Sequence, residues 1–480
     1  MKKGPKHSVN SWNSGSEAIE KLWDPVVVRK MARELADIAA DGLLHNTGEV
    51  RTPPCERVAA TIIKKAGNPD LISLVRDIQR SSLHLSHPRF AAQQVAAPIP
   101  AAALVESVVA ALNQSLAVWE MSPLATPIDR DLVNDFKKLF GYPRTADGSF
   151  VPGGAFSNLT ALLAARDALE PKAAKSGQGR IGLIVGAQAH YSVARSAAIL
   201  GLGRDAVFRV PLNLEFSTDV ERTHEAFAAA RRAGFRKFIL IGSSGSTPTG
   251  SFDDLVALRQ IATKYRAWLH VDAAHGGGLA FSRKYRKQLR GIDRPDSITF
   301  DPHKMMFMPL SAGGVLVRHG SHLAEPLHEQ APYLFGSTRR WPDIGQVTIA
   351  CSQRFDALKT WIVWRAYGSK IWDTLATHVC DVAQAAFHYC AESAALQPVH
   401  QPQSNIFCFR LRCEHGRDVD RRHWAIKEEI NESGFAYISS TVLDGRRVLR
   451  LVVMNPRTTV DHIRAILHRV EEIATRHGWA

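Results

Sequence analysis

The chain has 480 residues, of which 45% are hydrophobic and 22% charged, with a formal net charge of +14. This length predicts two or three domains around a large core, and the composition is typical of a globular protein in water. Prolines and glutamines interrupt the longest uncharged stretches and the basic N-terminus lacks an apolar core, so no membrane span or secretory signal is expected, only a cytoplasmic location.

The first 95 residues are predicted to be mostly helical, and residues 17–45 give the clearest helical pattern. Short apolar runs then alternate with helical patterns. The helices are expected at 221–234 and 252–265, and the strands at 180–190, 236–246, 267–277, 296–303 and 313–318. Buried strands that alternate with helices predict an α/β fold with a mostly parallel central sheet covered on both faces.

The pattern changes from about residue 376. A helix is followed by a strand at 405–413, a helix at 421–434, strands near 435–441 and 446–456, and a last helix at 459–478. The predicted organisation is therefore an N-terminal helical segment (1–95), a large α/β domain (96–375) and a small C-terminal α+β domain (376–480).

Two compositional features leave alternatives. The basic run at 282–290, SRKYRKQLR, fits either nucleic-acid binding or a solvated surface. We favour the solvated surface and expect no nucleic-acid partner, because no motif of interleaved aromatic and basic residues accompanies the run. The six cysteines form no CxxC pair, so reduced thiols are expected and no metal site is predicted.

Polar residues stand where several predicted strands end. Ligands bind at the carboxyl ends of the strands in such sheets. A Gly-Gly pair before the helix near Ser157 could also offer free N–H groups to a phosphate. Each feature alone has a simpler explanation as a turn, a helix cap or a structural histidine, but together they suggest a site formed by His190, the loop from Gly242, Asp272, His275, His303 and Lys304.

Lys304 lies in the stretch SITFDPHKMMFMPLSAGG, residues 297–314, and an uncharged segment follows it. A buried ammonium is costly, and this cost is avoided where the lysine nitrogen is held covalently as an imine. Pyridoxal 5′-phosphate uses such a lysine together with a phosphate cradle, a stacking ring and a buried carboxylate. The sequence therefore predicts this cofactor.

From about His87 to Asn455 the chain resembles the group II pyridoxal-phosphate-dependent amino acid decarboxylases, through the motifs HPRF, MSPLAT, GGAFSN, HVDAAHGG, DSITFDPHK and LRLVVMNP. The resemblance implies the fold type I, aspartate aminotransferase-like fold and a homodimer with active sites at the interface. It makes Lys304 the Schiff-base lysine and Asp272 the partner of the pyridine nitrogen. The other cofactor residues that it implies are Ala274 and His190 on the two ring faces, Gly154, Ala155 and His303 at the phosphate, and Thr247 in the neighbouring loop.

The resemblance also implies the reaction, which converts an L-amino acid into the corresponding amine and CO2. In the family, a loop tyrosine protonates the quinonoid carbon after CO2 leaves, and Tyr333 lies at the matching position. Its simpler interpretation is an aromatic anchor for the loop, in which case another acid, such as His190, would deliver the proton. Alternatives are an aromatic amino acid decarboxylase, a decarboxylating aldehyde synthase, and an inactive relative that serves as a binding protein.

The substrate is left open by the sequence. Gln93 and Arg450 match positions that contact the distal carboxylate of the substrate in glutamate decarboxylases, although Gln93 fits a surface amide equally well. We expect a small acidic or diamino acid substrate rather than an aromatic one. Gln353 stands where relatives carry an arginine, which either alters the substrate pocket or removes a surface ion pair.

Overall fold

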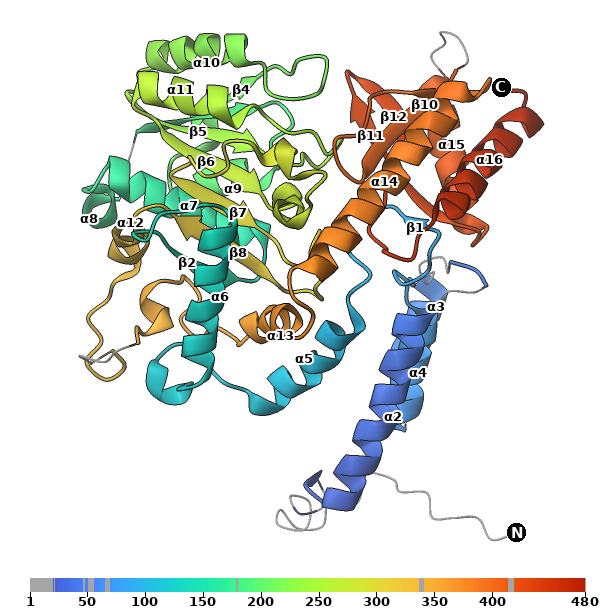
Figure 1. Cartoon of the computed structure of the whole chain (residues 1–480), viewed down its shortest axis with the longest axis horizontal. Coiled ribbons are helices and arrows are strands. Elements are labelled where there is room, and N and C mark those ends of the chain that lie inside the picture. The colour runs from blue at the N-terminus through green and yellow to red at the C-terminus, as the bar shows by residue number, and fades with distance from the viewer. Residues whose placement is uncertain are drawn as a thin grey trace.

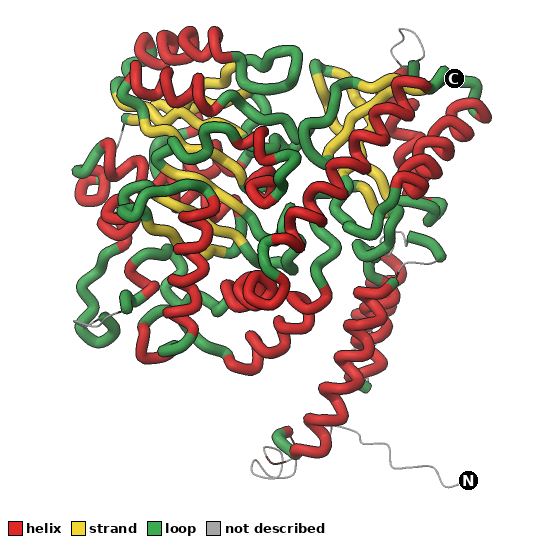
Figure 2. The backbone as a smooth tube through the Cα atoms, in the orientation of Figure 1, coloured by secondary structure: helices red, strands yellow, loops and turns green. Residues whose placement is uncertain are grey.

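The computed structural model describes residues 20, 22–45, 48–50, 56–64, 70–177, 180–335, 341–412 and 418–479. Figure 1 shows a large α/β body, a smaller sheet with its own helices beside it, and a helical arm that projects from the smaller part. Figure 2 shows that the strands gather in two separate groups, one in each part.

The large body is built on a seven-stranded sheet in the order β2-β8-β7-β6-β5-β3-β4. Neighbouring strands from β7 to β4 are parallel, whereas β8 runs antiparallel to both β7 and β2. This arrangement confirms the predicted α/β fold. The strands are β2 (Asp147–Val151), β3 (Ile181–Gly186), β4 (Val207–Val210), β5 (Lys237–Ser243), β6 (Trp268–Ala273), β7 (Ser297–Phe300) and β8 (Gly313–Val317).

Helices cover this sheet because the strands are apolar on both faces. Helix α7 (Gly154–Leu169) packs against β6, β7 and β8, and α11 (Leu255–Tyr265) packs against β5 and β6. Helix α11 begins at Leu255 because the Asp254 carboxylate accepts the backbone N–H groups of the first turn. The other helices of the body are α5 (Pro100–Leu112), α6 (Ala125–Leu139), α8 (Ala173–Ser176), α9 (Ser192–Ile199), α10 (Val220–Arg232), α12 (Gly320–Ala324) and α13 (Ala357–Tyr367).

The smaller part contains a five-stranded sheet in the order β1-β11-β12-β10-β9. Its strands are β1 (Phe90–Ala91), β9 (Leu396–Pro398), β10 (Ile406–Leu411), β11 (Tyr437–Leu443) and β12 (Arg446–Val452). Helices α14 (Lys370–Glu392), α15 (Val419–Glu432) and α16 (Val460–Arg476) accompany it, so the predicted C-terminal elements are confirmed. Strand β1 comes from the N-terminal segment, and α14 crosses residue 376; the domain boundaries stay a prediction.

The N-terminal arm consists of α2 (Pro25–Leu44), α3 (Glu56–Lys64) and α4 (Leu71–Ser81), with α2 and α4 side by side in Figure 1. The helix expected over 17–45 has its regular part from Pro25, because the Asp24 carboxylate caps α2 there. Most of the expected first two turns, residues 17–19 and 21, lies outside the described residues.

The basic run 282–290 is partly neutralised by its neighbours. Arg283 forms an ion pair with Asp373 at 2.7 Å, and Lys284 forms one with Asp381 at 2.6 Å; both carboxylates belong to α14. Two of the basic side chains in the run therefore form ion pairs with helix α14 on the protein surface. Across the described ranges, no helix combines the length and apolar character needed to cross a membrane.

Candidate active site

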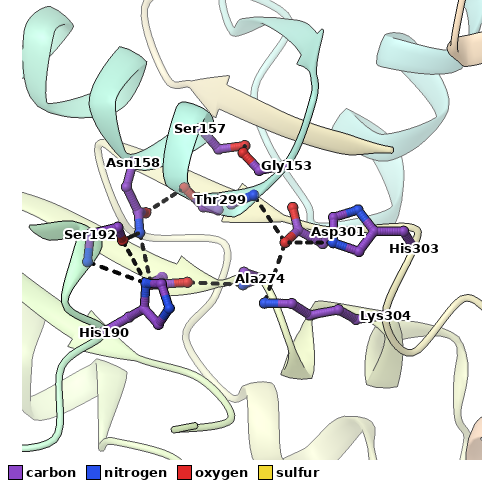
Figure 3. A network of polar contacts seen from close by, with 12 residues as sticks. Gly153, Ser157, Asn158, His190, Ser192, Ala274, Thr299, Asp301, His303 and Lys304 are labelled. Atoms are coloured by element: carbon purple, nitrogen blue, oxygen red, sulfur yellow. Dashed lines mark hydrogen bonds and ion pairs between the residues drawn. The ribbon is translucent and has the colours of Figure 1, made fainter. Parts of the chain in front are cut away.

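A cavity of about 340 Å³ opens where β5, β6 and β7 end and α7 begins. Figure 3 shows His190 and Ser192 on one side of the polar network at this place, and Lys304, Asp301 and His303 on the other. The cavity brings together residues that are far apart in the sequence, as expected at the carboxyl ends of parallel strands. Its lining includes Gly153, Gly154, Ala155, Asn158, Gln188, His190, Thr247, Asp272, Ala274, His275, Asp301, His303 and Lys304.

Lys304 lies just beyond the end of β7, in a turn in which its backbone N–H bonds to the carbonyl of Asp301 at 3.0 Å. Its side chain is 19% exposed, and Nζ lies 3.4 Å from Oδ2 of Asp301. The amine therefore lies in a mostly buried position, beside one carboxylate and at the cavity. A nucleophilic amine in such a place can bond covalently to a carbonyl carbon.

Asp301 connects this lysine to the start of α7. Its Oδ2 accepts the backbone N–H of Gly154 at 3.0 Å and lies 3.5 Å from Nε2 of His303. The other oxygen, Oδ1, is buried and has no hydrogen-bond partner within the described residues. The Lys304 amine, the His303 ring and the Gly154 N–H thus converge on the Asp301 carboxylate, which holds the lysine and the start of α7 together.

The two glycines of the GGAF motif permit this close approach. A Cβ atom on Gly154 would lie 2.8 Å from Oδ2 of Asp301, and one on Gly153 would lie 3.0 Å from Cε1 of His303. In the first turn of α7 the Gly154 N–H bonds to Asp301 and the Phe156 and Ser157 N–H groups bond to the Gly153 carbonyl, which leaves the N–H of Ala155 for a ligand at the cavity wall. The positive end of the helix dipole points the same way and favours a negative ligand group.

His303 is held as a neutral ring with its proton on Nε2. The backbone N–H of Ala312 donates to Nδ1 at 3.2 Å, so the single ring proton sits on Nε2, toward Asp301. Burial lowers the pKa of His303, which keeps the ring uncharged near neutral pH.

Asp272, near the end of β6, holds a carboxylate at the wall of the cavity. Its Oδ2 accepts an N–H of the Asn158 amide at 2.8 Å, and its Oδ1 accepts the backbone N–H of Ala274 at 3.1 Å. Two donors stabilise the negative charge of this carboxylate away from bulk water. A carboxylate in this state can pair with a protonated ring nitrogen.

His190 and Ala274 also line the cavity. The hydroxyl of Ser192 lies 2.7 Å from Nδ1 of His190, and the Ser192 backbone N–H donates to the same atom at 3.3 Å. Burial lowers the pKa of His190, so a neutral ring with a planar face is available for stacking.

Three residues singled out in the sequence do not line this cavity. Gln93 is exposed, and the side chain of Tyr333 is 91% exposed. Arg450 of β12 lies behind the wall, where it donates to the carbonyl of Thr247 and to that of Ala92, both at 3.3 Å. Gln353 is 7% exposed, so it is a buried residue and not one half of a surface pair.

Sequence reasoning assigned no role to Asp301 or Asn158. Both stand inside quoted motifs, Asp301 in DPHK and Asn158 in GGAFSN. Neither motif reveals that the two side chains face the same cavity from β7 and α7, because that requires the packing of the helix on the sheet. Gln188 and Ser246 likewise join the lining only through the fold.

A mostly parallel sheet with a lysine, a carboxylate and an anion cradle at its carboxyl edge is the architecture of a pyridoxal-phosphate enzyme. Residues 60–412 match the pyridoxal-dependent decarboxylase conserved domain. The chain belongs to this family, and it is a pyridoxal-phosphate-dependent amino acid decarboxylase, a carboxy-lyase.

Three comparisons illustrate the relationship. The chain is 32% identical over 409 residues to the L-2,4-diaminobutyrate decarboxylase of Rhizobium meliloti (strain 1021). That match covers 84% of this chain and 81% of the relative. It is 30% identical over 364 residues to the cysteine sulfinic acid decarboxylase of Rattus norvegicus. That match covers 72% of this chain and 74% of the relative. The crystal structure of mouse CSAD has a TM-score of 0.87 at 25% identity and covers 94% of this chain and 99% of that chain.

The residues present fit pyridoxal 5′-phosphate, the cofactor of the family. The fit rests on Ala155 and His303 at the cavity wall beside the start of α7, on the glycines at which a Cβ atom would narrow the cavity, and on the Asp272 carboxylate at the same cavity. Among the described residues, no group of three or more His, Cys, Asp or Glu side chains is placed to hold a metal ion.

Proposed function

We propose that Lys304 holds the aldehyde carbon of the cofactor and that the start of α7 holds its phosphate, through Gly154, Ala155 and His303. In this assignment Asp272 faces the ring nitrogen. His190 and Ala274 pack on the two ring faces, and Thr247 lies in the loop beside them. The observation that carries the proposal is the convergence of all these residues on one cavity.

When bound, pyridoxal phosphate supplies a ring that accepts the electron pair left behind as the carboxylate departs as CO2. The chain's own residues make this acceptance possible. Asp272, already held by two N–H donors, keeps a proton on the ring nitrogen, and the stacked side chains exclude water from the ring faces.

We assign to Tyr333 the delivery of a proton to the substrate Cα after CO2 has left. A phenol hydroxyl can donate this proton, and proton transfer by a positioned acid contributes about 10²–10⁴-fold in rate. Because Tyr333 is 91% exposed, loop movement or assembly with a second chain must bring its hydroxyl to a cavity.

We further propose that the substrate is a small acidic or diamino acid, and the surroundings of Arg450 favour the acidic class. Its guanidinium touches only two carbonyl groups, and its Nε is buried with no hydrogen-bond partner in the described part of the chain. Burial lowers the pKa of Arg450, which is the mark of a cation without a compensating carboxylate. A substrate carboxylate would supply that missing partner.

A panel of amino acids tests the substrate. The purified, cofactor-loaded protein is given glutamate, aspartate, cysteine sulfinate, 2,4-diaminobutyrate, tyrosine, tryptophan and Dopa in turn, and CO2 release is measured. We expect an acidic amino acid to have the highest kcat/KM, and Arg450→Met to raise its KM while Arg450→Lys restores part of the affinity. Preferred turnover of an aromatic amino acid would contradict the substrate proposal.

We also propose that the protein works as a homodimer. Helix α5 carries Leu104, Val108 and Leu112 at four-residue spacing, and these side chains are 44%, 49% and 51% exposed. Residues at this spacing share one helix face, so α5 presents an apolar stripe to solvent in the single chain. A second copy would cover such a stripe. The cytoplasmic location stays a prediction.

A further inference from the structure

One buried amide connects the Asp272 carboxylate to Ser192, the hydrogen-bond partner of His190. Asn158 lies one turn into α7, is 1% exposed, and lines the cavity. Its Nδ2 donates to Oδ2 of Asp272 at 2.8 Å and to Oγ of Ser192 at 2.9 Å. Its Oδ1 lies 3.0 Å from Nε2 of His270 and accepts from the hydroxyl of Thr299 at 2.9 Å. Figure 3 shows this amide between Ser192 and Thr299.

The surrounding groups set the orientation of the amide. Ser297 Oγ accepts the indole N–H of Trp268 at 2.9 Å, which leaves its own proton for Nδ1 of His270, also at 2.9 Å. Burial lowers the pKa of His270 to about 4, so the ring is neutral and its one proton is on Nε2. Two donors, His270 and Thr299, thus face the oxygen of Asn158, and the NH2 group must face Asp272.

The same amide determines the hydrogen bonding of His190. Ser192 Oγ already accepts a proton from Asn158, so the Ser192 hydroxyl is free to donate to Nδ1 of His190 at 2.7 Å. The proton of the neutral His190 ring is therefore on Nε2. Asn158 acts directly on the carboxylate and, through Ser192, on the imidazole.

We propose that Asn158 is the positioning residue of the site, which aims the Asp272 carboxylate at the cavity and sets the orientation and tautomer of His190. This inference rests on the proposed function, specifically on the assignment of Asp272 and His190 to the cofactor ring. Asn158 does its work through these two residues and not by reacting itself.

Affinity for pyridoxal phosphate provides the test, because it is measured without turnover. The cofactor is removed, and its dissociation constant is determined for the wild type, Asn158→Ala and Thr299→Val. Loss of a hydrogen bond to a charged group predicts that Asn158→Ala weakens binding by about ten- to hundredfold. Thr299→Val is the matched control, because it removes a contact of the amide oxygen and leaves both Nδ2 bonds in place; we expect about a twofold change or less.

A double-mutant cycle separates positioning from general packing. In the Asp272→Asn background the charge on which Asn158 acts is gone. Only the uncharged hydrogen bonds from Asn158 through Ser192 to His190 then remain to be lost, so Asn158→Ala should change the dissociation constant by about threefold or less. An equally large loss in both backgrounds would overturn the inference and reduce Asn158 to a packing residue.

Two further measurements complete the design. If Asn158→Ala does not fold, Asn158→Leu keeps a similar volume and removes the donors without adding a charge, and the same loss of affinity is required of it. If Asp272→Asn binds the cofactor as tightly as the wild type, the proposed function itself fails at Asp272. If only the coupling between the two positions is missing, the inference about Asn158 fails alone.

Discussion

At the scale of single residues, the site depends on donors and acceptors that match in number and charge. Oδ2 of Asp301 receives the Gly154 N–H and lies beside the Lys304 amine, so one carboxylate organises both the helix start and the lysine. The contact with this buried carboxylate holds the Lys304 side chain in place before any ligand arrives.

Lys304 should be the residue to which the cofactor attaches. Borohydride reduction of the loaded protein should link the cofactor to the peptide that contains Lys304, as detected by mass spectrometry. Lys304→Ala should fold and bind the cofactor without this link, and its turnover should fall close to background because the nucleophilic amine is gone. The surface variant Lys284→Ala serves as the control and should label normally. Labelling of Lys359 in place of Lys304 would show that the assignment is wrong.

At the scale of elements, the carboxyl edge of the sheet and the start of α7 create the site together. The end of β6 carries Asp272, the segment after β7 carries Asp301 and Lys304, and the Gly154 N–H at the start of α7 bonds to Asp301. The segment with Tyr333, between α12 and α13, is the element that the static arrangement leaves apart from the cavity. Under the proposed role of Tyr333, loop movement or a second chain brings this segment to a cavity.

Tyr333→Phe should reduce amine formation by about 10²–10⁴-fold, because phenylalanine fills the same volume but has no proton to give. Cofactor affinity should be unchanged, and it serves as the internal control. With oxygen supplied, the variant should consume one O2 and one water per substrate and release CO2, aldehyde, ammonia and hydrogen peroxide. Amine formation at the wild-type rate would mean that Tyr333 is only a loop anchor.

At the scale of the whole molecule, the interior holds several histidines that burial keeps neutral. Burial lowers the pKa of His270 to about 4 and that of His275 to about 3, from an ordinary value of 6.5. His275 donates from Nε2 to Oδ1 of Asn405 at 2.8 Å, which ties the large body to the small sheet. Protonation of either ring in acid would therefore disturb the contacts that His270 and His275 make near the site.

Stability of the cofactor-free protein should fall as the pH drops below 6.5. The unfolded chain then binds protons that the folded chain does not bind. Each such histidine lowers the free energy of unfolding by about 1.4 kcal/mol per pH unit until the pH reaches its folded pKa. Urea unfolding at a series of pH values measures this slope. His275→Gln keeps a donor toward Asn405. It should reduce the pH dependence of the free energy of unfolding by the contribution of one histidine. A free energy of unfolding that stays constant down to pH 5 would contradict this account.

The assembly can be tested through the apolar stripe on α5. Sedimentation should give a mass of twice 52.9 kDa for the wild type. Val108→Glu places a charge in the stripe and should weaken the dimer by about tenfold or more, because burying an unpaired carboxylate is costly. Leu214→Glu is the control, since Leu214 is 99% exposed and lies in the segment between β4 and α10. A wild type that sediments as a monomer would refute the dimer.

The sequence alone determined the elements whose local signals are strong. Apolar runs such as 180–190 and 236–246 became β3 and β5, and α10 and α11 formed where the 3.6-residue period and the Asp caps placed them. It did not indicate β2, whose first residues are Asp147 and Gly148. This edge strand exists because β8 offers it a ladder of hydrogen bonds, which is a long-range cause.

For the proposed site, the sequence indicated which residues would carry the chemistry, because the motifs around Lys304 and Asp272 combine residue types that few other reactions need. Only the tertiary structure decided which groups support them. Asn158, Asp301 and Ser192 acquire their roles from distances between α7, α9 and the strand ends, and these distances depend on how helices pack on a twisted sheet. Local sequence encodes propensity and periodicity, whereas a hydrogen bond between residues 114 positions apart, as from Asn158 to Asp272, exists only once the core has formed.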